Sequence, residues 1–254
     1  MAKVTLENLN KIFLSKIGKD VKAVNDFNLL LEDGEILALL GSSGCGKTTT
    51  LRMIAGFETA TSGQIKIGER IVNDLKPADR NVAMAFEGYA LYPPLTVKDN
   101  IAFSLMREKI SKDKVDSKVM EVAELLEITD ILERYPPSIS GGQQQRVSLA
   151  RALVRDSDAL LLDEPMSQLE PQLRAVLRAR VKDYIQHNNK TVIFVTHDQT
   201  EAVALADKIA VMENGDLKQL ASPYEISAKP SNVFVASFIG CLLYTSDAAD
   251  EEAS

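Results

Sequence analysis

Short hydrophobic runs alternate with helically spaced hydrophobic residues along most of the chain. The runs have the length of buried strands and are rich in Leu, Val and Ile. Strands are predicted at Val4–Leu9, Val21–Leu31, Glu35–Leu40, Gln64–Ile67, Glu69–Val72, Asn81–Phe86, Ala159–Leu162, Thr191–Thr196, Lys208–Glu213 and Asp216–Leu220. Helical spacing follows at Thr48–Ala55 and from Ser140, Pro171 and Gln199. Strands that alternate with helices indicate an α/β protein with a mainly parallel, covered sheet.

A helical insert interrupts this alternation. From Thr96 to Leu132 the spacing is helical and richly charged, with Thr96 and Ser111 as candidate N-caps, and Tyr135-Pro136-Pro137 ends the block. We therefore expect an α/β core formed by residues 1–86 and 156–240, and a separate helical lobe at 87–155.

Composition limits the class of protein. With 254 residues, of which 45% are hydrophobic, the chain can bury a sizeable core. Its longest hydrophobic runs are far shorter than a membrane-spanning helix, so we expect a soluble or peripheral protein. The net charge of −7 argues against general nucleic-acid binding, which usually needs a basic face. Cys45 and Cys241 lie in unrelated contexts, which argues against a disulfide scaffold and is typical of the reducing cytosol.

The last segment, residues 241–254, differs from the rest of the chain. It contains four acidic residues and no basic one, and so carries more than half of the net charge. Its sequence resembles the translated read-through of an adapter used in sequencing libraries. We set it aside on that interpretation; the alternative is a natural disordered acidic tail.

A glycine-rich loop follows the buried strand Glu35–Leu40 and precedes a helix. Its sequence fits the phosphate-binding pattern in full, and the candidate phosphate ligands are Gly41, Ser42, Ser43, Gly44, Cys45, Gly46, Lys47, Thr48 and Thr49. Gly44 and Gly46 allow the backbone N–H groups to wrap around phosphates. Lys47 would reach the β- and γ-phosphates, and the Thr48 hydroxyl would bind Mg²⁺.

Two acidic residues and a histidine end neighbouring predicted strands. Asp163 and Glu164 follow the strand Ala159–Leu162, at the edge where α/β sheets hold ligands. Asp163 is the candidate Mg²⁺ ligand, and Glu164 is the candidate general base for an attacking water. His197 follows the strand Thr191–Thr196 and is a candidate contact to the γ-phosphate and that water.

The stretch Ser140–Arg146 is a second candidate phosphate site. Ser140, Gly141 and Gly142 stand at the start of a helical run, where free backbone N–H groups and the positive end of the helix dipole favour an anion. Since the phosphate loop of this chain lies far upstream, the stretch reads as half of a site completed by a second subunit.

These elements, in this order, resemble the nucleotide-binding subunit of ABC transporters. Ile139–Gln143 is similar to the signature motif of that family, and residues 77–84 and 89–93 are similar to its bacterial carbohydrate-importer branch. The resemblance implies a P-loop NTPase (RecA-like) core with an antiparallel β subdomain and a helical signature subdomain. Members of the branch normally carry a C-terminal regulatory β-barrel, so we expect the natural protein to continue past Gly240.

The resemblance also implies ligands and roles. ATP and Mg²⁺ are the implied ligands. Ser140, Gly141, Gly142 and Gln143 would bind the γ-phosphate of the nucleotide held by the opposite subunit. Phe13 occupies the place of the aromatic residue that stacks on adenine, with a plain core role as the alternative.

Two positions depart from the family pattern. Glu87 stands where the family has Gln, in the loop joining core and lobe, and is a candidate metal ligand and catalytic residue. A carboxylate adds negative charge beside Asp163 and Glu164, so we expect altered proton binding or tighter metal dependence. Glu170 replaces the usual Asp. Asymmetric pairing with a sister ATPase and tolerated variation in a homodimer both stay open.

The predicted function is the ATP-hydrolysing, nucleotide-binding subunit of an ABC importer for sugars or polyols, at the cytoplasmic face of the bacterial inner membrane. Its expected partners are a second ATPase subunit, membrane permease subunits and, indirectly, a solute-binding protein. Exposed-looking Tyr89, Leu91 and Tyr92 would hold a permease helix. The alternatives are a weakly hydrolysing partner in a heterodimer and a non-transport ABC ATPase.

Overall fold

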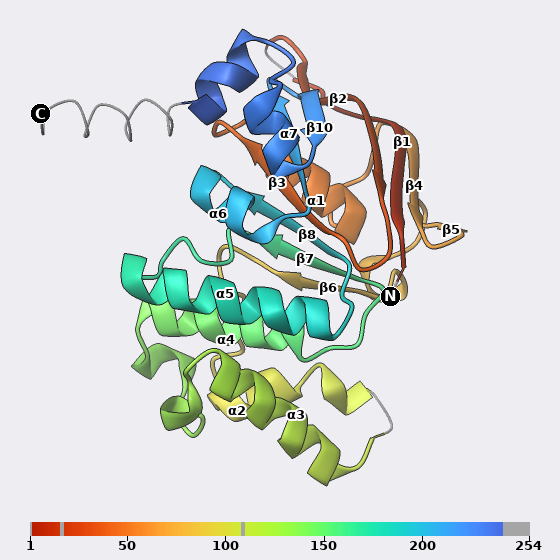
Figure 1. The fold of residues 1–254 in the computed structure, drawn as a ribbon. Helices are drawn as coiled ribbons and strands as arrows, with labels where there is room; N and C mark the ends of the chain where they lie inside the picture. Colours follow the sequence, from red (N-terminus) through yellow and green to blue (C-terminus); the bar gives the residue numbers. More distant parts are fainter. Residues whose placement is uncertain (1, 16–17, 108–109, 241–254) are drawn as a thin grey trace, which may run out of the picture.

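The computed structural model describes residues 2–15, 18–107 and 110–240 (Figure 1), so the acidic segment 241–254 lies outside the described residues. Within them, ten strands form one sheet in the order β5-β4-β1-β2-β10-β9-β3-β8-β7-β6. The strands are β1 Val4–Phe13, β2 Val21–Leu31, β3 Ile36–Gly41, β4 Ser62–Ile67, β5 Arg70–Ile71, β6 Val82–Ala85, β7 Ala159–Asp163, β8 Val192–Thr196, β9 Lys208–Glu213 and β10 Asp216–Ala221.

The helices cover this sheet and build the lobe below it in Figure 1. They are α1 Lys47–Ala55, α2 Val97–Ala102, α3 Lys112–Leu125, α4 Gly141–Leu153, α5 Pro171–His187, α6 Gln199–Leu205 and α7 Pro223–Ala228. Short 3₁₀ turns lie at Pro77–Asp79, Leu105–Arg107, Thr129–Ile131 and Pro136–Ser138.

The sheet has an antiparallel part and a parallel part. Strands β5, β4, β1 and β2 pair antiparallel, whereas β9, β3, β8, β7 and β6 pair parallel. The two parts meet where β10 pairs antiparallel with β9 and contacts β2 through Asp216 and Asn25. In the parallel part Leu40 lies beside Thr196, and Asp163 lies beside Val195. The carboxyl ends of β3, β8 and β7 therefore meet at one edge.

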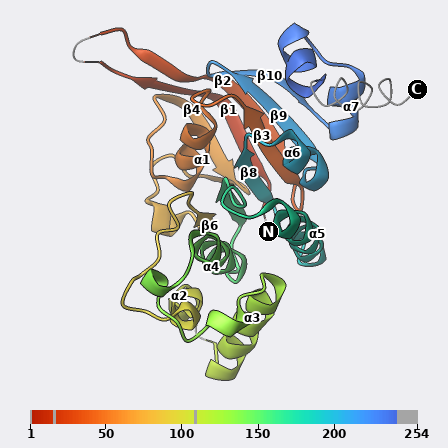
Figure 2. The ribbon, with the colours of Figure 1, turned by 90° about the vertical axis from the view of Figure 1, so that its left-hand side faces the viewer.

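The alternation of side chains along β3 builds two hydrophobic clusters. Leu37 and Leu39 face α1 and the antiparallel strands, while Ala38 and Leu40 face the cluster that includes α4, α5 and α6. Figure 2 shows α1 on one side of the parallel strands and α5 and α6 on the other. Covered faces on both sides explain why β3, β7 and β8 are buried along their whole length and almost entirely hydrophobic.

The helical block predicted from Thr96 to Leu132 forms two helices, α2 and α3, which pack against each other and against α4. Thr96 caps α2, because its hydroxyl accepts a hydrogen bond from the Asp99 N–H at 3.1 Å. Ser111 stands at the N-cap of α3, but its side chain makes no capping hydrogen bond.

Two elements differ from the sequence prediction. Strand β1 continues to Phe13, beyond the predicted end at Leu9, because it pairs with β2 on one side and β4 on the other. Helix α7 was not predicted, although Ser222 and Glu225 form a capping box, a pattern that the sequence does contain.

Arg80 locks the end of α1 to the turn that follows β5. Its side chain is buried, and its guanidinium donates to backbone carbonyls on both sides. These are the carbonyls of Met53 at 2.7 Å, Ile54 at 3.0 Å, Asn73 at 3.0 Å and Leu75 at 2.9 Å. No carboxylate in the described part of the chain lies at hydrogen-bond distance from this buried charge, so these carbonyls are what stabilises it.

We predict that Arg80→Met lowers the free energy of unfolding by about 3 kcal/mol, because it leaves buried carbonyls without donors. Urea unfolding followed by circular dichroism measures the change. Arg180→Met is the control, since Arg180 pairs with Glu127 at 2.8 Å with both side chains nearly half exposed; it should cost less than about 1 kcal/mol. Equal losses of unfolding free energy in the two variants would show that the carbonyl hydrogen bonds of Arg80 contribute no more than an exposed ion pair.

Candidate functional site

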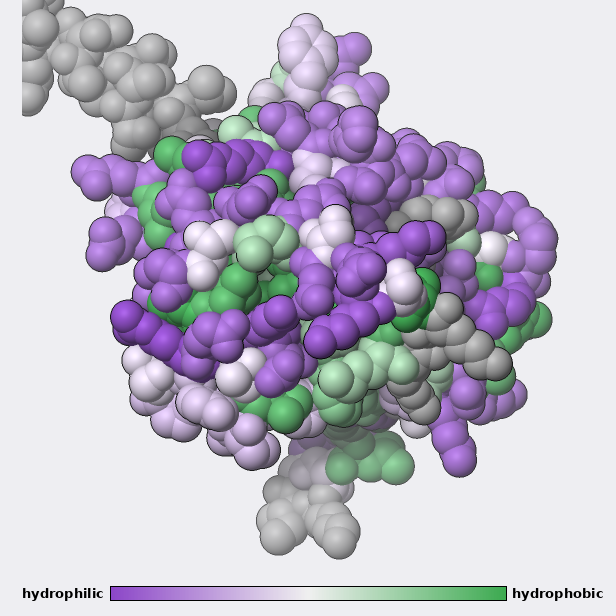
Figure 3. All heavy atoms as spheres, turned by 90° about the horizontal axis from the view of Figure 1, so that it is seen from below, coloured by the Kyte–Doolittle hydropathy of each residue, from purple (hydrophilic) through white to green (hydrophobic). Residues whose placement is uncertain are grey.

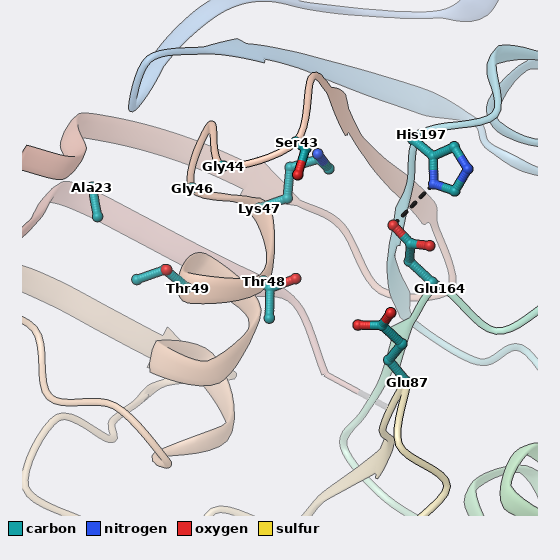
Figure 4. A pocket seen from close by; sticks show the side chains of 10 residues that line it. All are labelled: Ala23, Ser43, Gly44, Gly46, Lys47, Thr48, Thr49, Glu87, Glu164 and His197. Atoms are coloured by element: carbon teal, nitrogen blue, oxygen red, sulfur yellow. Dashed lines mark hydrogen bonds and ion pairs between the residues drawn. The ribbon is translucent and has the colours of Figure 1, made fainter. Parts of the chain in front are cut away.

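A cavity of about 500 Å³ opens at the carboxyl edge of β3, β7 and β8. Figure 4 shows the glycine loop and α1 on one side of it and the acidic side chains on the other. It is lined by Ala23, Ser43, Gly44, Gly46, Lys47, Thr48, Thr49, Glu87, Glu164 and His197. The structure thus brings residues from the glycine loop, from the loop after β6 and from the ends of β7 and β8 to one place.

The glycine loop packs its backbone tightly against β2. Gly46 has φ +105°, and a Cβ atom there would lie 2.2 Å from the Ala23 carbonyl oxygen. No side chain caps α1 at Gly46. The N–H groups of its first turn are therefore available to an anion in the cavity, with the positive end of the helix dipole behind them. Ala23 was not predicted, because nothing in the sequence distinguishes a small residue whose backbone contacts the loop.

The Lys47 side chain folds back onto the glycine loop that precedes it. Its side chain is buried, and Nζ donates to the carbonyl oxygens of Gly41 at 2.7 Å and Ser42 at 2.8 Å. Cys45 is also buried, with its Sγ 3.7 Å from Lys47 Nζ, as expected for a small side chain that fills space inside the loop. Among the described residues the ammonium group has no carboxylate partner, and it lines the cavity where phosphate oxygens could replace these carbonyls.

Two of the three predicted metal ligands contact each other. Thr48 Oγ1 donates to Asp163 Oδ1 at 2.9 Å, and Asp163 is buried at the end of β7. Burial raises the pKa of Asp163; the Thr48 hydrogen bond opposes this, and the charges of Glu87 and Glu164 add to it.

This donor set fits Mg²⁺ that is completed by phosphate oxygens. Among the described residues, no three His, Cys, Asp or Glu side chains are grouped closely enough to hold a metal by themselves. Mg²⁺ is commonly bound through one or two carboxylates together with substrate phosphates and water. Thr48 and Asp163 beside a phosphate-binding loop provide the protein part of such a site.

Glu164 and His197 form a pair at the cavity. His197 Nδ1 lies 3.0 Å from Glu164 Oε1, and Figure 4 shows this contact. Glu164 is partly buried, whereas His197 is largely exposed. Glu164 has φ +48°, a left-handed conformation that is unusual for a residue with a side chain. The pairing fixes the direction of the carboxylate. The predicted catalytic roles of both residues stay predictions.

Glu87 lies in the same cavity. It follows β6, is exposed, and Figure 4 places its carboxylate between Thr48 and Glu164. Glu170 lies elsewhere, at the N-cap of α5, and its side chain makes no capping hydrogen bond.

The predicted contact residues of a second nucleotide lie outside the cavity lining. Ser140 caps α4, accepting a hydrogen bond from the Gln143 N–H at 3.3 Å, while Gln143 Oε1 accepts from the Ser140 N–H at 3.0 Å. The expectation of a bare helix N-terminus is therefore too simple, because this capping box occupies two of the donors. Gly141 is exposed, so this helix end is accessible from outside the molecule.

Phe13 also lies outside the cavity lining. It ends β1 with 41% of its surface exposed, and the Lys11 ammonium stands 4.7 Å from its ring centre. Exposure does not fit a plain core role, and adenine stacking stays a prediction.

The loop predicted to hold a permease helix is less exposed than expected. Tyr89 and Leu91 are half-buried, and Leu91 packs against the main hydrophobic cluster. Tyr92 is exposed and its ring packs at a tilt against that of Phe103, with ring centres 4.6 Å apart. Figure 3 views the molecule from the side of the helical lobe and shows hydrophobic patches within a mostly hydrophilic surface. Met106, in the same lobe, is 68% exposed.

A glycine loop between β3 and α1, with carboxylates at the end of β7, defines a P-loop nucleoside triphosphatase fold. The family described as ABC transporter matches residues 24–167. The trehalose/maltose import ATP-binding protein MalK of Thermococcus litoralis is 50% identical over 246 residues, which is 94% of this chain and 65% of that protein. The sn-glycerol-3-phosphate import ATP-binding protein UgpC of Brucella abortus is 44% identical, over 94% of this chain and 67% of its own length.

A solved structure of an ATP-binding cassette is also similar to this chain. A dimeric structure of the ATP-binding cassette MJ0796 in a post-hydrolysis state, bound to ADP and Pi, has a TM-score of 0.80 and 27% identity, over 87% of this chain and 98% of that one. This chain belongs to the ABC transporter family. It spans about two thirds of the length of the curated import proteins that it matches. No helix in the described part of the chain is long and apolar enough to cross a bilayer.

We predict that Mg²⁺ binding weakens as the pH falls through the raised pKa of Asp163, because only the ionised carboxylate binds the metal. Glu87→Gln removes one charge that raises this pKa, so the acid limb should move to lower pH. Mg²⁺ titrations of nucleotide binding across pH measure this. The control is Glu69→Gln, which removes an exposed carboxylate paired with Lys3. A limb that stays in place in Glu87→Gln would contradict the prediction.

Proposed function

We propose that this chain is the ATP-binding and ATP-hydrolysing subunit of an ABC importer for sugars or polyols, acting at the cytoplasmic face of a bacterial inner membrane. The observation that carries the proposal is the single cavity that joins the glycine loop with the Glu164–His197 pair. The two import relatives support the solute class, since their names give trehalose, maltose and sn-glycerol-3-phosphate.

The residues in and beside the cavity would have separate roles in hydrolysis. The N–H groups of the loop and Lys47 would hold the phosphates, and Thr48 and Asp163 would hold Mg²⁺, which neutralises phosphate charge. Glu164 would accept the proton of the attacking water as general base, and His197 would keep its carboxylate aimed at that water. The strands β3, β7 and β8, which position these groups, are buried, so the groups would keep their places without large rearrangement.

A second subunit would complete the site. The N-terminus of α4 is accessible but separate from the cavity, so it would contact a nucleotide held by another copy or by a sister ATPase. Dimer closure on ATP would then drive permease subunits, which receive solute from a binding protein. Tyr92, Phe103 and Met106 are exposed apolar residues of the lobe and would contact the permease.

A second candidate follows from Glu87. A third carboxylate beside Asp163 and Glu164 adds like charge around the metal and phosphates. The chain would then bind ATP and close but hydrolyse it weakly, as one member of an asymmetric pair.

Steady-state phosphate release with Mg²⁺ and ATP tests both candidates. We expect wild-type turnover to fall about 100-fold or more in Glu164→Gln while ATP binding is retained, because only the general base is lost. Lys47→Ala should lose ATP binding instead. A Glu87→Gln variant that hydrolyses many times faster than wild type supports the second candidate, and an unchanged rate removes it. Wild-type protein that binds no ATP would overturn both.

A further inference from the structure

Gln145 is an amide side chain buried between the helical lobe and the core. It lies on α4, in the turn after Ser140 and Gly142, and only 3% of its surface is exposed. Its side chain points away from solvent towards the segment that follows β7. A buried amide needs partners for its polar atoms, so its contacts show what it holds.

Within the described residues, the hydrogen bonds of this amide all go to the segment from Glu164 to Gln168. Nε2 donates to the carbonyl oxygen of Glu164 at 2.9 Å and to Ser167 Oγ at 3.1 Å. Oε1 accepts from the Gln168 N–H at 2.9 Å. One side chain of α4 thus binds the general-base residue and the backbone after it.

The backbone at Glu164 needs such support. Its φ of +48° places a residue with a side chain in the left-handed region, which costs free energy unless the surroundings hold it. The Glu164 N–H donates to Val195 on β8 at 3.0 Å, while its carbonyl accepts from Gln145. The sheet therefore fixes one side of this residue, and α4 fixes the other.

Close packing strengthens the same link. A Cβ atom at Gly142 would lie 3.2 Å from the Gln168 carbonyl oxygen, so the first turn of α4 rests almost directly on this backbone. From the other side, the Arg174 guanidinium donates to the carbonyls of Ser167 at 3.2 Å and Leu169 at 2.9 Å. The segment has little freedom to move independently of α4.

We infer that Gln145 is a positioning residue that ties the Glu164 carboxylate to helix α4, so that the two halves of the composite site are linked within one subunit. The inference rests on the proposed function. When the Ser140 end of α4 engages a nucleotide, any shift of α4 reaches Glu164 of the same chain through this amide. Hydrolysis in one site thereby depends on occupancy of the other.

Gln144 provides a matched control. It is the neighbouring glutamine on the same helix, and its Nε2 also donates two hydrogen bonds, to the carbonyls of Pro136 at 3.0 Å and Ile139 at 3.2 Å. Both partners lie in the turn that precedes α4. Gln144→Leu therefore removes a similar number of bonds without touching the segment after β7.

The experiment compares Gln145→Leu, Gln145→Glu and Gln144→Leu with wild type. Hydrogen exchange of nucleotide-free protein should show faster exchange at residues 164–170 in Gln145→Leu only, because the Gln168 N–H loses its acceptor. Gln145→Glu keeps that acceptor but loses the donors to Glu164, so it should retain the Gln168 protection. Both Gln145 variants should lose kcat about tenfold or more with ATP affinity within about twofold of wild type. Gln144→Leu should match wild type in the exchange of residues 164–170.

Wild-type kcat in Gln145→Leu, or exchange at residues 164–170 that is the same in Gln145→Leu and Gln144→Leu, would overturn the inference. If Gln145→Leu fails to fold, Gln145→Glu decides it: wild-type kcat in that variant would equally overturn the link. Wild-type protein without ATPase activity is a different result, because it refutes the proposed function and leaves the exchange comparison to judge the link.

Discussion

The parallel pairing of β3, β8 and β7 is the constraint on which the site depends. It brings the glycine loop, Asp163, Glu164 and His197 to one edge, although more than a hundred residues separate the loop from Glu164. The hydrophobic faces on both sides of these strands fix their register, because a slip of one residue would exchange the two clusters. The positions of the side chains at this edge are therefore fixed by the packing of the core.

The helical lobe adds the part of the site that the sheet cannot supply. Its helix α4 presents an accessible N-terminus away from the cavity, while the buried face of the same helix reaches Glu164 through Gln145. One helix thus has an accessible end and a side that is hydrogen-bonded to the segment after β7.

The sequence predicted the P-loop fold, because buried strands, the glycine loop and capped helices are local signals. It could not predict contacts that depend on three-dimensional packing. These include the return of Lys47 onto its own loop, the Glu164–His197 pair and the capping box that closes Ser140 onto Gln143. Gln145 lay within a recognised motif, yet only burial reveals its partners. The division into core and lobe at 86 and 156, and the role of each site residue, stay predictions.

The central claim is that the nucleotide site is shared between two subunits. Mixing Lys47→Ala protein with Ser140→Trp protein tests it most directly, because each variant alone has no intact site. In a mixed dimer one site combines an intact glycine loop with an intact α4 end. ATPase activity should then recover to at most about a quarter of wild type on random pairing, and to less than that because the second site of each mixed dimer stays empty. A mixture as inactive as its components, beside an active wild type, would contradict the account.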